Sequence, residues 1–404
     1  MCGTVQAMSN SPTDLDTILT RGVVETIGDD VLRSRLRAGE KLRIKLGIDP
    51  TSPHVHIGRA VQLLKLRDFQ QAGHTVVFIV GDFTGVIGDT SDKDSERPML
   101  DREQIEANKS TYFAQVGKVL DLSLVETHEN SAWLANLTYR EIGEHADCFS
   151  VADFIARDNI KRRLDAGKRV SLREVLYPLM QGYDSVAVRA DVELGGTDQR
   201  FNLLAGRVLQ ERLGQGAQSI LMGPLINGLD GRKMSSSWGN TINLTDSPED
   251  MYGKVMSLRD ELIPNYYEYC TRVSMEDVVA VCDGLAANTL HPRDAKMRLA
   301  RELVTLYHGA DAAVGAEQHF VQTFQERGIP DDIPSVSVIA GSALVDTLLK
   351  AGMVASKSEW RRLVDGGAVE VVGDGARVTD PSLVVDHAIT LKIGKRRFVQ
   401  LLVE

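Results

Sequence analysis

The chain has 404 residues, 43% of them hydrophobic, and a formal net charge of −10 at neutral pH. This length suggests two or three globular domains, and the acidic balance argues against a protein that coats nucleic acid nonspecifically. No apolar run is long enough to span a membrane, and the N-terminal residues lack the pattern of a secretory signal. Because the four cysteines are scattered, as suits a reducing compartment, we expect a cytoplasmic protein.

The first strongly patterned segment predicts a strand, a helix and a second strand. Residues 42–48 alternate at the period of a strand, residues 56–72 repeat at helical spacing, and residues 75–80 are almost wholly apolar. The N–H groups at the start of a helix are unpaired and attract phosphate. His56 offers a donor in that first turn, and Gly58 lets a nucleotide lie against the backbone. Ordinary helix packing gives the same pattern.

A glycine-rich loop is expected over residues 81–89, directly after the second strand. In doubly wound sheets, ligands bind beyond the carboxyl ends of the strands. Asp89 therefore either faces a pocket at that edge or caps the next turn. The polar run that follows contains Lys93 and Arg97, which either close over a polyphosphate or are simply solvated.

A stripe of polar side chains marks the next part of the chain, after helices expected over 102–120 and 139–166. Tyr177, Gln181 and Asp184 are spaced i, i+4 and i+7, which places them on one face of a helix. Three hydrogen-bonding groups in an otherwise apolar segment would be costly in a core without a polar partner. The stripe therefore predicts a small polar ligand.

Two further loops follow strands expected over residues 186–194 and 219–225. Asp198 stands in the first helical turn after one strand, where it either accepts from ribose hydroxyls or caps the helix. The loop after the other strand, GLDGRKMSSS, combines flexible glycines with Arg232, Lys233 and three serines. Such donors suit a triphosphate whose charge changes during a reaction.

The chain after this loop changes character twice. From residue 248 the apolar pattern is helical to about residue 327, and the last seventy residues alternate short helices with strands. We expect a Rossmann-like doubly wound α/β domain over 1–240, an α-helical domain over 241–330 and a small α+β domain over 335–404. The last domain contains clusters of basic residues, which suit contact with RNA. Its candidate RNA-binding residues are Lys357, Arg361, Arg362, Lys395 and Arg396.

Together these motifs resemble the class I aminoacyl-tRNA synthetases, and specifically the tyrosyl-tRNA synthetase family, along almost the whole chain. The segment DPTSPHVHIG is similar to the H-I-G-H signature, and KMSSS is similar to the K-M-S-K-S loop. The tail SKSEWRRLVDGGAVEVVG is similar to a small RNA-binding domain shared with a ribosomal protein. The resemblance implies activation of L-tyrosine by ATP, transfer of the tyrosyl group to tRNA(Tyr), and a homodimer without membrane association. Mg²⁺ would be carried with ATP, and no metal would be bound by the protein itself.

The resemblance also implies roles for individual residues. The tyrosine substrate would be bound by Gly47, Asp89, Tyr177, Gln181, Asp184 and Gln199. ATP would be bound by Asp49, Thr51, His56, Gly58, Arg59, Gly196, Asp198, Leu225, Ile226, Lys233, Ser236 and Ser237. The catalytic groups would be His56, Lys93, Arg97 and Lys233. Asp184 would receive the phenolic hydroxyl, and a buried acceptor that phenylalanine leaves unpaired rejects that amino acid strongly.

Three positions depart from the family pattern. The second histidine of H-I-G-H is Arg59, and the second lysine of K-M-S-K-S is Ser236. Lys45 stands where the family has a tyrosine that contacts the substrate hydroxyl. We hypothesise that Arg59 replaces part of the missing lysine charge. Two alternatives stay open: a paralogue that uses another amino acid or acceptor, and a catalytically silent RNA-binding homologue.

Overall fold

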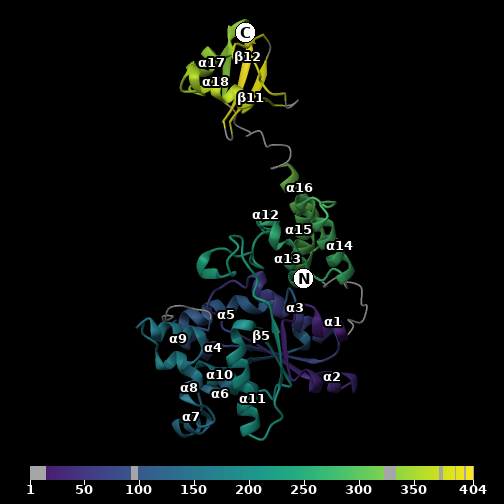
Figure 1. Cartoon of the computed structure of the whole chain (residues 1–404), viewed down its shortest axis with the longest axis vertical. Coiled ribbons are helices and arrows are strands. Elements are labelled where there is room, and N and C mark those ends of the chain that lie inside the picture. The colour runs from purple at the N-terminus through teal and green to yellow at the C-terminus, as the bar shows by residue number, and fades with distance from the viewer. Residues whose placement is uncertain are drawn as a thin grey trace. The chain divides into compact units, whose positions relative to one another are not determined.

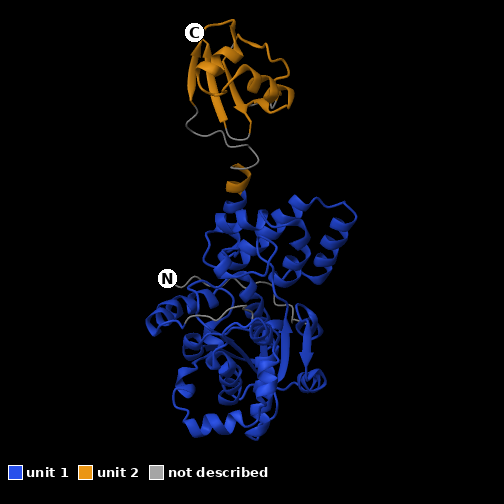
Figure 2. Cartoon of the chain, turned by 60° about the vertical axis from the view of Figure 1, so that its left-hand side comes forward, with its two compact units in different colours: residues 1–317 blue, residues 318–404 orange. Residues whose placement is uncertain are grey.

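The structure is a computed structural model, and its elements are labelled in Figure 1. It describes residues 15–91, 99–322, 334–372, 376–386, 388–394 and 397–403. The chain divides into two units, residues 1–317 and residues 318–404 (Figure 2).

A six-stranded sheet forms the centre of the first unit, with the strand order β1-β6-β5-β2-β3-β4 (Figure 1). The strands are β1 (Glu25–Ile27), β2 (Arg43–Ile48), β3 (Thr75–Val80), β4 (Val125–Glu129), β5 (Val192–Gly196) and β6 (Ser219–Gly223). Neighbours from β6 to β4 are parallel, and β1 is antiparallel to β6. The expected doubly wound sheet is confirmed. Its strand order reverses between β2 and β5, which is where such sheets bind ligands.

The first strand, helix and strand lie where the sequence predicts them. Helix α3 (Ile57–Gln71) follows β2, and the side chain of His56 caps its first turn. Beyond its end, Gly73 adopts a positive φ of 88°, a conformation that other residues rarely adopt. Both α3 and β3 are largely buried, including Leu64 and residues 76–80. Such continuous burial is typical of a central parallel strand with helices on both faces.

The glycine-rich loop expected over residues 81–89 was a wrong prediction, because most of it forms helix α4 (Asp82–Ile87). Packing rather than propensity accounts for this helix. Gly85 lies so close to Ile105 that a Cβ atom would come within 3.0 Å of its Cδ1 atom. Glycine therefore allows α4 to pack tightly, although glycine weakens an isolated helix.

The single helix expected over residues 139–166 was also wrong. Three short helices replace it, namely α7 (Tyr139–Ala146), α8 (Val151–Ile155) and α9 (Asp158–Asp165). The hydroxyl of Ser150 accepts from a backbone N–H at the start of α8. A serine at this position satisfies an unpaired donor and favours a new helix start.

The strand expected over residues 186–194 begins later, because helix α10 (Leu172–Ala187) extends into that range. The apolar residues between them are buried without being part of a strand, since Val188 packs with Val77 in a small core cluster. Strand β1 lies within residues 11–40, where the sequence predicts one or two amphipathic helices, and β4 was not predicted. The residues of both strands are at most half-buried, so they lack the apolar pattern on which the prediction relied.

The other helices before residue 240 are α1 (Leu15–Thr20), α2 (Asp29–Arg37), α5 (Arg102–Val116), α6 (Ser131–Leu134) and α11 (Arg200–Arg212). The helical stretch expected after residue 248 consists of α12 (Pro248–Met256), α13 (Ile263–Cys270), α14 (Met275–Ala286), α15 (Pro292–His308) and α16 (Ala310–Phe320). The three domain boundaries at 240, 330 and 335 stay predictions. Among the described residues, no helix combines the length and apolarity that crossing a bilayer requires.

The second unit is a small α+β domain with its own core. Its helices are α17 (Leu344–Lys350) and α18 (Lys357–Asp365), close to the helices that the sequence predicts over 343–351 and 356–365. One sheet has the order β7-β12-β11-β9 and the other pairs β10 with β8. These strands are β7 (Ser335–Val338), β8 (Ser342–Ala343), β9 (Val369–Val371), β10 (Val384–Val385), β11 (Ile389–Ile393) and β12 (Arg397–Val403). Trp360 is buried at the centre of the hydrophobic cluster.

Candidate active site

A cavity of about 750 Å³ lies at the carboxyl ends of β2 and β5, where the strand order reverses. It is lined by every residue predicted for the tyrosine site: Gly47, Asp89, Tyr177, Gln181, Asp184 and Gln199. It is also lined by every residue predicted for ATP: Asp49, Thr51, His56, Gly58, Arg59, Gly196, Asp198, Leu225, Ile226, Lys233, Ser236 and Ser237. Lys93 and Arg97 lie outside the described residues.

His56 is held in one orientation by the helix that it caps. Its Nδ1 atom accepts from the backbone N–H of Arg59 at 3.3 Å, so in the neutral ring the proton is on Nε2. Burial, with the nearby charges of Arg59 and Lys233, lowers the pKa of His56 to about 3. The ring is therefore a neutral Nε2–H donor at physiological pH, at a helix N-terminus that already attracts anions.

Arg59 extends from the first turn of α3 toward the loop after β2. Its guanidinium donates to the hydroxyl of Tyr112 at 3.0 Å and, at 3.4 Å each, to Thr51 Oγ1 and to the backbone carbonyl of Asp49. These neutral acceptors hold the guanidinium beside the cavity without neutralising its charge. The position can therefore supply a cation to a bound anion.

The loop of residues 228–237, here called the serine-rich loop, closes another side of the cavity. The backbone N–H of Met234 donates to the carbonyl of Ile226 at 2.7 Å, which fixes one end of the loop. Lys233 Nζ lies 3.0 Å from Asp198 Oδ2, so the loop is also tied to the turn after β5. Ser236 and Ser237 are exposed at the rim of the cavity.

Asp49 and Tyr177 meet on the wall of the cavity. The hydroxyl of Tyr177 donates to Asp49 Oδ2 at 2.8 Å, and the hydroxyl of Thr84 donates to Asp49 Oδ1 at 2.7 Å. Burial raises the pKa of Asp49 to about 6. Because its proton is given to Asp49, the Tyr177 oxygen offers only lone pairs to a ligand.

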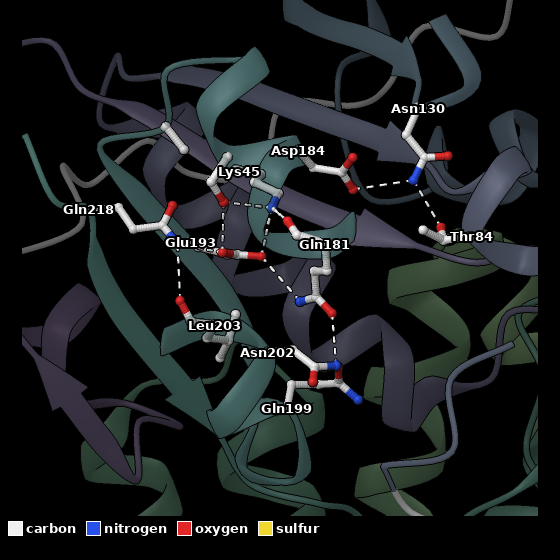
Figure 3. Close-up of polar contacts among 12 residues, drawn as sticks. Lys45, Thr84, Asn130, Gln181, Asp184, Glu193, Gln199, Asn202, Leu203 and Gln218 are labelled. Carbon is white, nitrogen blue, oxygen red and sulfur yellow. Dashed lines mark hydrogen bonds and ion pairs between the residues drawn. The ribbon is translucent and has the colours of Figure 1, made fainter. Parts of the chain in front are cut away.

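Asp184 forms the deep end of the cavity and is only 4% exposed. Its Oδ1 atom accepts from Trp133 Nε1 at 2.8 Å, and Oδ2 accepts from Asn130 Nδ2 at 3.2 Å. Asn130 also donates to Thr84 at 2.8 Å, as Figure 3 shows. Burial raises the pKa of Asp184 to about 7, because a carboxylate loses hydration there. The two donors leave lone pairs for a hydroxyl donor of a ligand.

Two glutamines that line the cavity, Gln181 and Gln199, both contact Asn202 (Figure 3). Gln181 Nε2 donates to Glu193 Oε1 at 3.2 Å, and Gln199 Nε2 donates to Asp89 Oδ2 at 2.8 Å. The Oε1 atoms of both glutamines accept from Asn202 Nδ2, each at 3.0 Å. Both amides are thus oriented by a carboxylate at the nitrogen and by Asn202 at the oxygen.

A charged pair lies behind the glutamines and does not line the cavity. Lys45 and Glu193 are 0% and 1% exposed, and Lys45 Nζ is 2.8 Å from Glu193 Oε1. Lys45 was expected only as a departure from the family pattern, and Glu193 was not predicted. A usable signal was present, since a charged residue inside an apolar strand requires a buried partner.

Other side chains at the site were missed because no pattern in the sequence marks them. Asn130 and Trp133 lie on the short segment that follows β4. Because β4 was not predicted as a strand, no site residue was expected after it. Tyr112 and Asn202 lie on helices α5 and α11, where nothing separates them from other buried polar residues.

The basic residues predicted to bind RNA lie on the second unit. Lys357, Arg361 and Arg362 are exposed on α18, and Lys357 Nζ is 2.8 Å from Asp346 Oδ1. Lys395 and Arg396 lie outside the described residues. An exposed basic helix over a packed core can contact phosphate backbones without disturbing the fold.

One group of carboxylates among the described residues is spaced closely enough for a metal ion, namely Asp82, Glu106 and Glu129. None of the three lines the cavity. Lys109 Nζ lies 2.7 Å from Glu106 and 2.9 Å from Glu129, so a lysine already balances part of their charge.

Comparison with known proteins places this geometry in a family. The model of the class I tRNA synthetases (W and Y) matches residues 37–325. The tyrosine–tRNA ligase of Moorella thermoacetica is 48% identical over 95% of this chain and 94% of that protein. The tyrosine–tRNA ligase of Thermotoga maritima is 44% identical over 97% of this chain and 98% of that protein.

Solved structures agree on the fold. A tyrosyl-tRNA synthetase from Archaeoglobus fulgidus, complexed with L-tyrosine, has a TM-score of 0.60 at 23% identity, covering 74% of this chain and 98% of that one. A truncated mitochondrial tyrosyl-tRNA synthetase from Aspergillus nidulans has a TM-score of 0.64 at 22% identity, covering 75% of this chain and 92% of that one.

Proposed function

Since the chain belongs to the class I tRNA synthetases for tryptophan and tyrosine, among the tyrosine–tRNA ligases, we propose that its cavity is where tyrosine meets ATP. The enzyme activates tyrosine to tyrosyl-adenylate and then charges tRNA(Tyr). One observation carries the assignment of the site. The polar stripe of Tyr177, Gln181 and Asp184 lines the same cavity as His56 and Lys233.

The amino acid lies along α10, with its phenol toward Asp184. The carboxylate there accepts the phenolic O–H, while Trp133 and Asn130 hold it in place. The ammonium group needs acceptors, and Tyr177 Oη and the Gln181 amide oxygen supply them. Asp89 and Gln199 complete this end of the pocket, and Gly47 leaves room for the backbone of the substrate.

The nucleotide lies between α3 and the serine-rich loop. Asp198 accepts from the ribose hydroxyls, and the adenine lies between Leu225 and Ile226 beside Gly196. Gly58 lets the phosphates approach the helix N-terminus, since a Cβ there would come within 3.1 Å of His56 Nδ1. Asp49, Thr51, Ser236 and Ser237 frame the phosphate path. Mg²⁺ would arrive with ATP and share its phosphate charge.

Two displacements make up the reaction. A carboxylate oxygen of tyrosine attacks the α-phosphorus in line, the bond to the bridging oxygen breaks, and pyrophosphate leaves. The terminal ribose hydroxyl of tRNA then attacks the tyrosyl carbonyl, and AMP leaves. Neither step needs a nucleophile from the protein, so catalysis consists of positioning and of stabilising developing charge. His56 and Lys233 serve the leaving pyrophosphate, and Lys93 and Arg97 are assigned to the same task.

The remaining partners are assigned from the family and from surface charge. The second unit contacts tRNA through Lys357, Arg361 and Arg362, together with Lys395 and Arg396. The enzyme acts as a homodimer in the cytoplasm, without a metal ion of its own.

Tyrosine-dependent exchange of pyrophosphate into ATP, repeated with Asp184→Ala, tests the proposal. We expect exchange with tyrosine that is largely lost in the variant. Exchange with another amino acid in a panel would indicate a paralogue of different specificity, and no exchange with any amino acid would indicate a silent RNA-binding homologue.

A further inference from the structure

The buried pair behind the cavity joins two neighbouring strands of the sheet. Lys45 on β2 and Glu193 on β5 are register partners in the sheet, and their charged atoms are 2.8 Å apart. Removing two charges from water is costly, and a well-packed apolar pair is often at least as stable. Stability therefore does not explain why a lysine and a glutamate occupy these positions.

The contacts of Glu193 point to what the pair does. Its Oε2 atom accepts from Ser185 at 3.0 Å and from Gln218 at 2.5 Å. Its Oε1 atom accepts from Lys45 and also from Gln181 Nε2, at 3.2 Å. Figure 3 shows the Gln181 side chain reaching from this carboxylate to Asn202. Of these contacts, only that with Gln181 leads to the wall of the cavity.

An amide has two ends of similar shape and opposite hydrogen-bonding character. An ionised carboxylate only accepts, so it binds the NH₂ end of Gln181 and turns the oxygen away. The oxygen then faces Asn202, which donates to it at 3.0 Å, and Gln181 itself lines the cavity. A flipped amide would present N–H donors there, and these would repel an ammonium group.

We propose that Lys45 and Glu193 are a positioning pair that fixes the Gln181 amide with its oxygen toward the ligand, so that the site selects amino acids with a free ammonium group. The inference rests on the proposed function, in which Gln181 binds that ammonium. Lys45 keeps the carboxylate charged. A buried carboxylate without its cation tends to become neutral, and a neutral acid both donates and accepts, so it no longer distinguishes the two ends of the amide.

The test compares two ligands that differ only in the ammonium group, L-tyrosine and 3-(4-hydroxyphenyl)propionate. Their dissociation constants for the full-length enzyme are measured calorimetrically. The selectivity ratio is the dissociation constant of 3-(4-hydroxyphenyl)propionate divided by that of L-tyrosine. We expect Glu193→Gln and Lys45→Met each to lower this ratio about tenfold, which is about 1.4 kcal/mol. Only the binding of tyrosine should weaken. The double variant should lower it no further, because both changes remove the same device. A purely structural role would instead weaken both ligands equally.

A second buried ion pair provides a matched control. The side chains of Arg163 and Glu174 are 1% and 0% exposed, and a guanidinium nitrogen of Arg163 lies 2.5 Å from Glu174 Oε2. Neither residue lines the cavity. Glu174→Gln removes a comparable buried charge and should keep the wild-type ratio, whatever it does to stability. Urea unfolding of each variant verifies that it is folded. If a single variant fails to fold, the double variant, which leaves no unpaired charge, decides the matter.

Gln181→Ala separates failure of this inference from failure of the proposed function. If Gln181→Ala keeps the wild-type ratio, Gln181 does not bind the ammonium and the proposed function is wrong at this residue. If Gln181→Ala lowers the ratio while the Lys45 and Glu193 variants keep it, the positioning pair is overturned.

Discussion

Lys233 Nζ lies 3.0 Å from Asp198 Oδ2, so the cation assigned to phosphate is paired with the carboxylate assigned to ribose. The pair ties the serine-rich loop to the turn after β5, and both residues line the cavity. A nucleotide gives each group a different partner, because ribose hydroxyls donate to the carboxylate and phosphates accept from the ammonium. On the proposed assignment, ATP binding exchanges this internal ion pair for two contacts with substrate, and it makes Lys233 available to the charge that develops on pyrophosphate.

Lys233→Ala should therefore slow tyrosyl-adenylate formation far more than it weakens tyrosine binding. We expect the single-turnover rate to fall about 100-fold or more, which is typical for the loss of a donor to developing charge. The dissociation constant of tyrosine should stay within about twofold, because the proposed role of Lys233 is toward the phosphates and not toward the amino acid. Arg212→Ala, which removes an exposed cation that does not line the cavity, is the control and should have little effect. Equal losses in rate and in tyrosine affinity would contradict a transition-state role.

Asp184→Ala should reduce the discrimination between tyrosine and phenylalanine. In the native enzyme, phenylalanine would leave a buried carboxylate without its hydroxyl partner, and sites of this kind reject such analogues by about 10⁴-fold or more. We expect the ratio of kcat/KM values in pyrophosphate exchange to fall at least about 100-fold in the variant. Trp133→Phe removes one donor to Asp184 but keeps the carboxylate, so it should reduce the discrimination between tyrosine and phenylalanine less than Asp184→Ala does. An unchanged ratio would place the phenol elsewhere.

The raised pKa of Asp184 also predicts how stability depends on pH. Burial raises that pKa from the ordinary 3.8 to about 7, so between these values the folded protein binds more protons than the unfolded chain. The contribution of Asp184 to stability is therefore lost as pH rises from about 4 to about 7. Across this interval, the free energy of unfolding of Asp184→Asn should rise relative to that of the wild type by about 1.4 kcal/mol per pH unit. Urea unfolding at several pH values measures the difference, and a constant difference would argue against the raised pKa.

The hypothesis about Arg59 predicts coupling between two positions. If its guanidinium supplies charge that Ser236 lacks, Arg59→Ala should lower the adenylation rate about tenfold or more, since one charge-stabilising donor is lost. Adding Ser236→Lys should restore part of that rate, although the two residues are on different elements. Tyr112→Phe removes the 3.0 Å contact that orients Arg59 and should have a smaller effect. Rapid-quench measurements decide between these outcomes, and an unchanged rate in Arg59→Ala would end the hypothesis.

The sequence was sufficient for the parts of the site that follow strands. His56, Asp198 and Lys233 each lie just beyond an apolar segment, and a parallel sheet brings the carboxyl ends of its strands to one edge. The stripe on α10 could be found because helical spacing alone aligns Tyr177 with Asp184. These inferences need only local periodicity and the topology of a doubly wound sheet.

The partners of these residues could not be found in the same way. Asn130 and Trp133 reach Asp184 from a segment after β4, and that edge strand has no apolar alternation. Asn202 orients Gln181 from the next helix, through a contact that depends on how α10 and α11 pack. At their closest approach, a Cβ on Gly182 would come within 3.0 Å of the α11 backbone. Such contacts are set by tertiary packing rather than by spacing in the sequence.

Removing the second unit should separate tRNA charging from amino-acid activation. A chain that ends at Phe320, the last residue of α16, keeps every described residue that lines the cavity. It should exchange pyrophosphate with tyrosine at the full-length rate, while kcat/KM for tRNA falls about tenfold or more, as expected when phosphate contacts are lost.

In the full-length enzyme, Arg361→Ala with Arg362→Ala should reproduce part of this loss and make charging less sensitive to salt, because fewer counterions are released on binding. Lys350→Ala removes another exposed cation of the same unit, outside the predicted RNA-binding set, and serves as the control. If the shortened chain charges tRNA as efficiently as the whole enzyme, the second unit is not the RNA contact. The tRNA would then have to be bound entirely by the unit that contains the cavity.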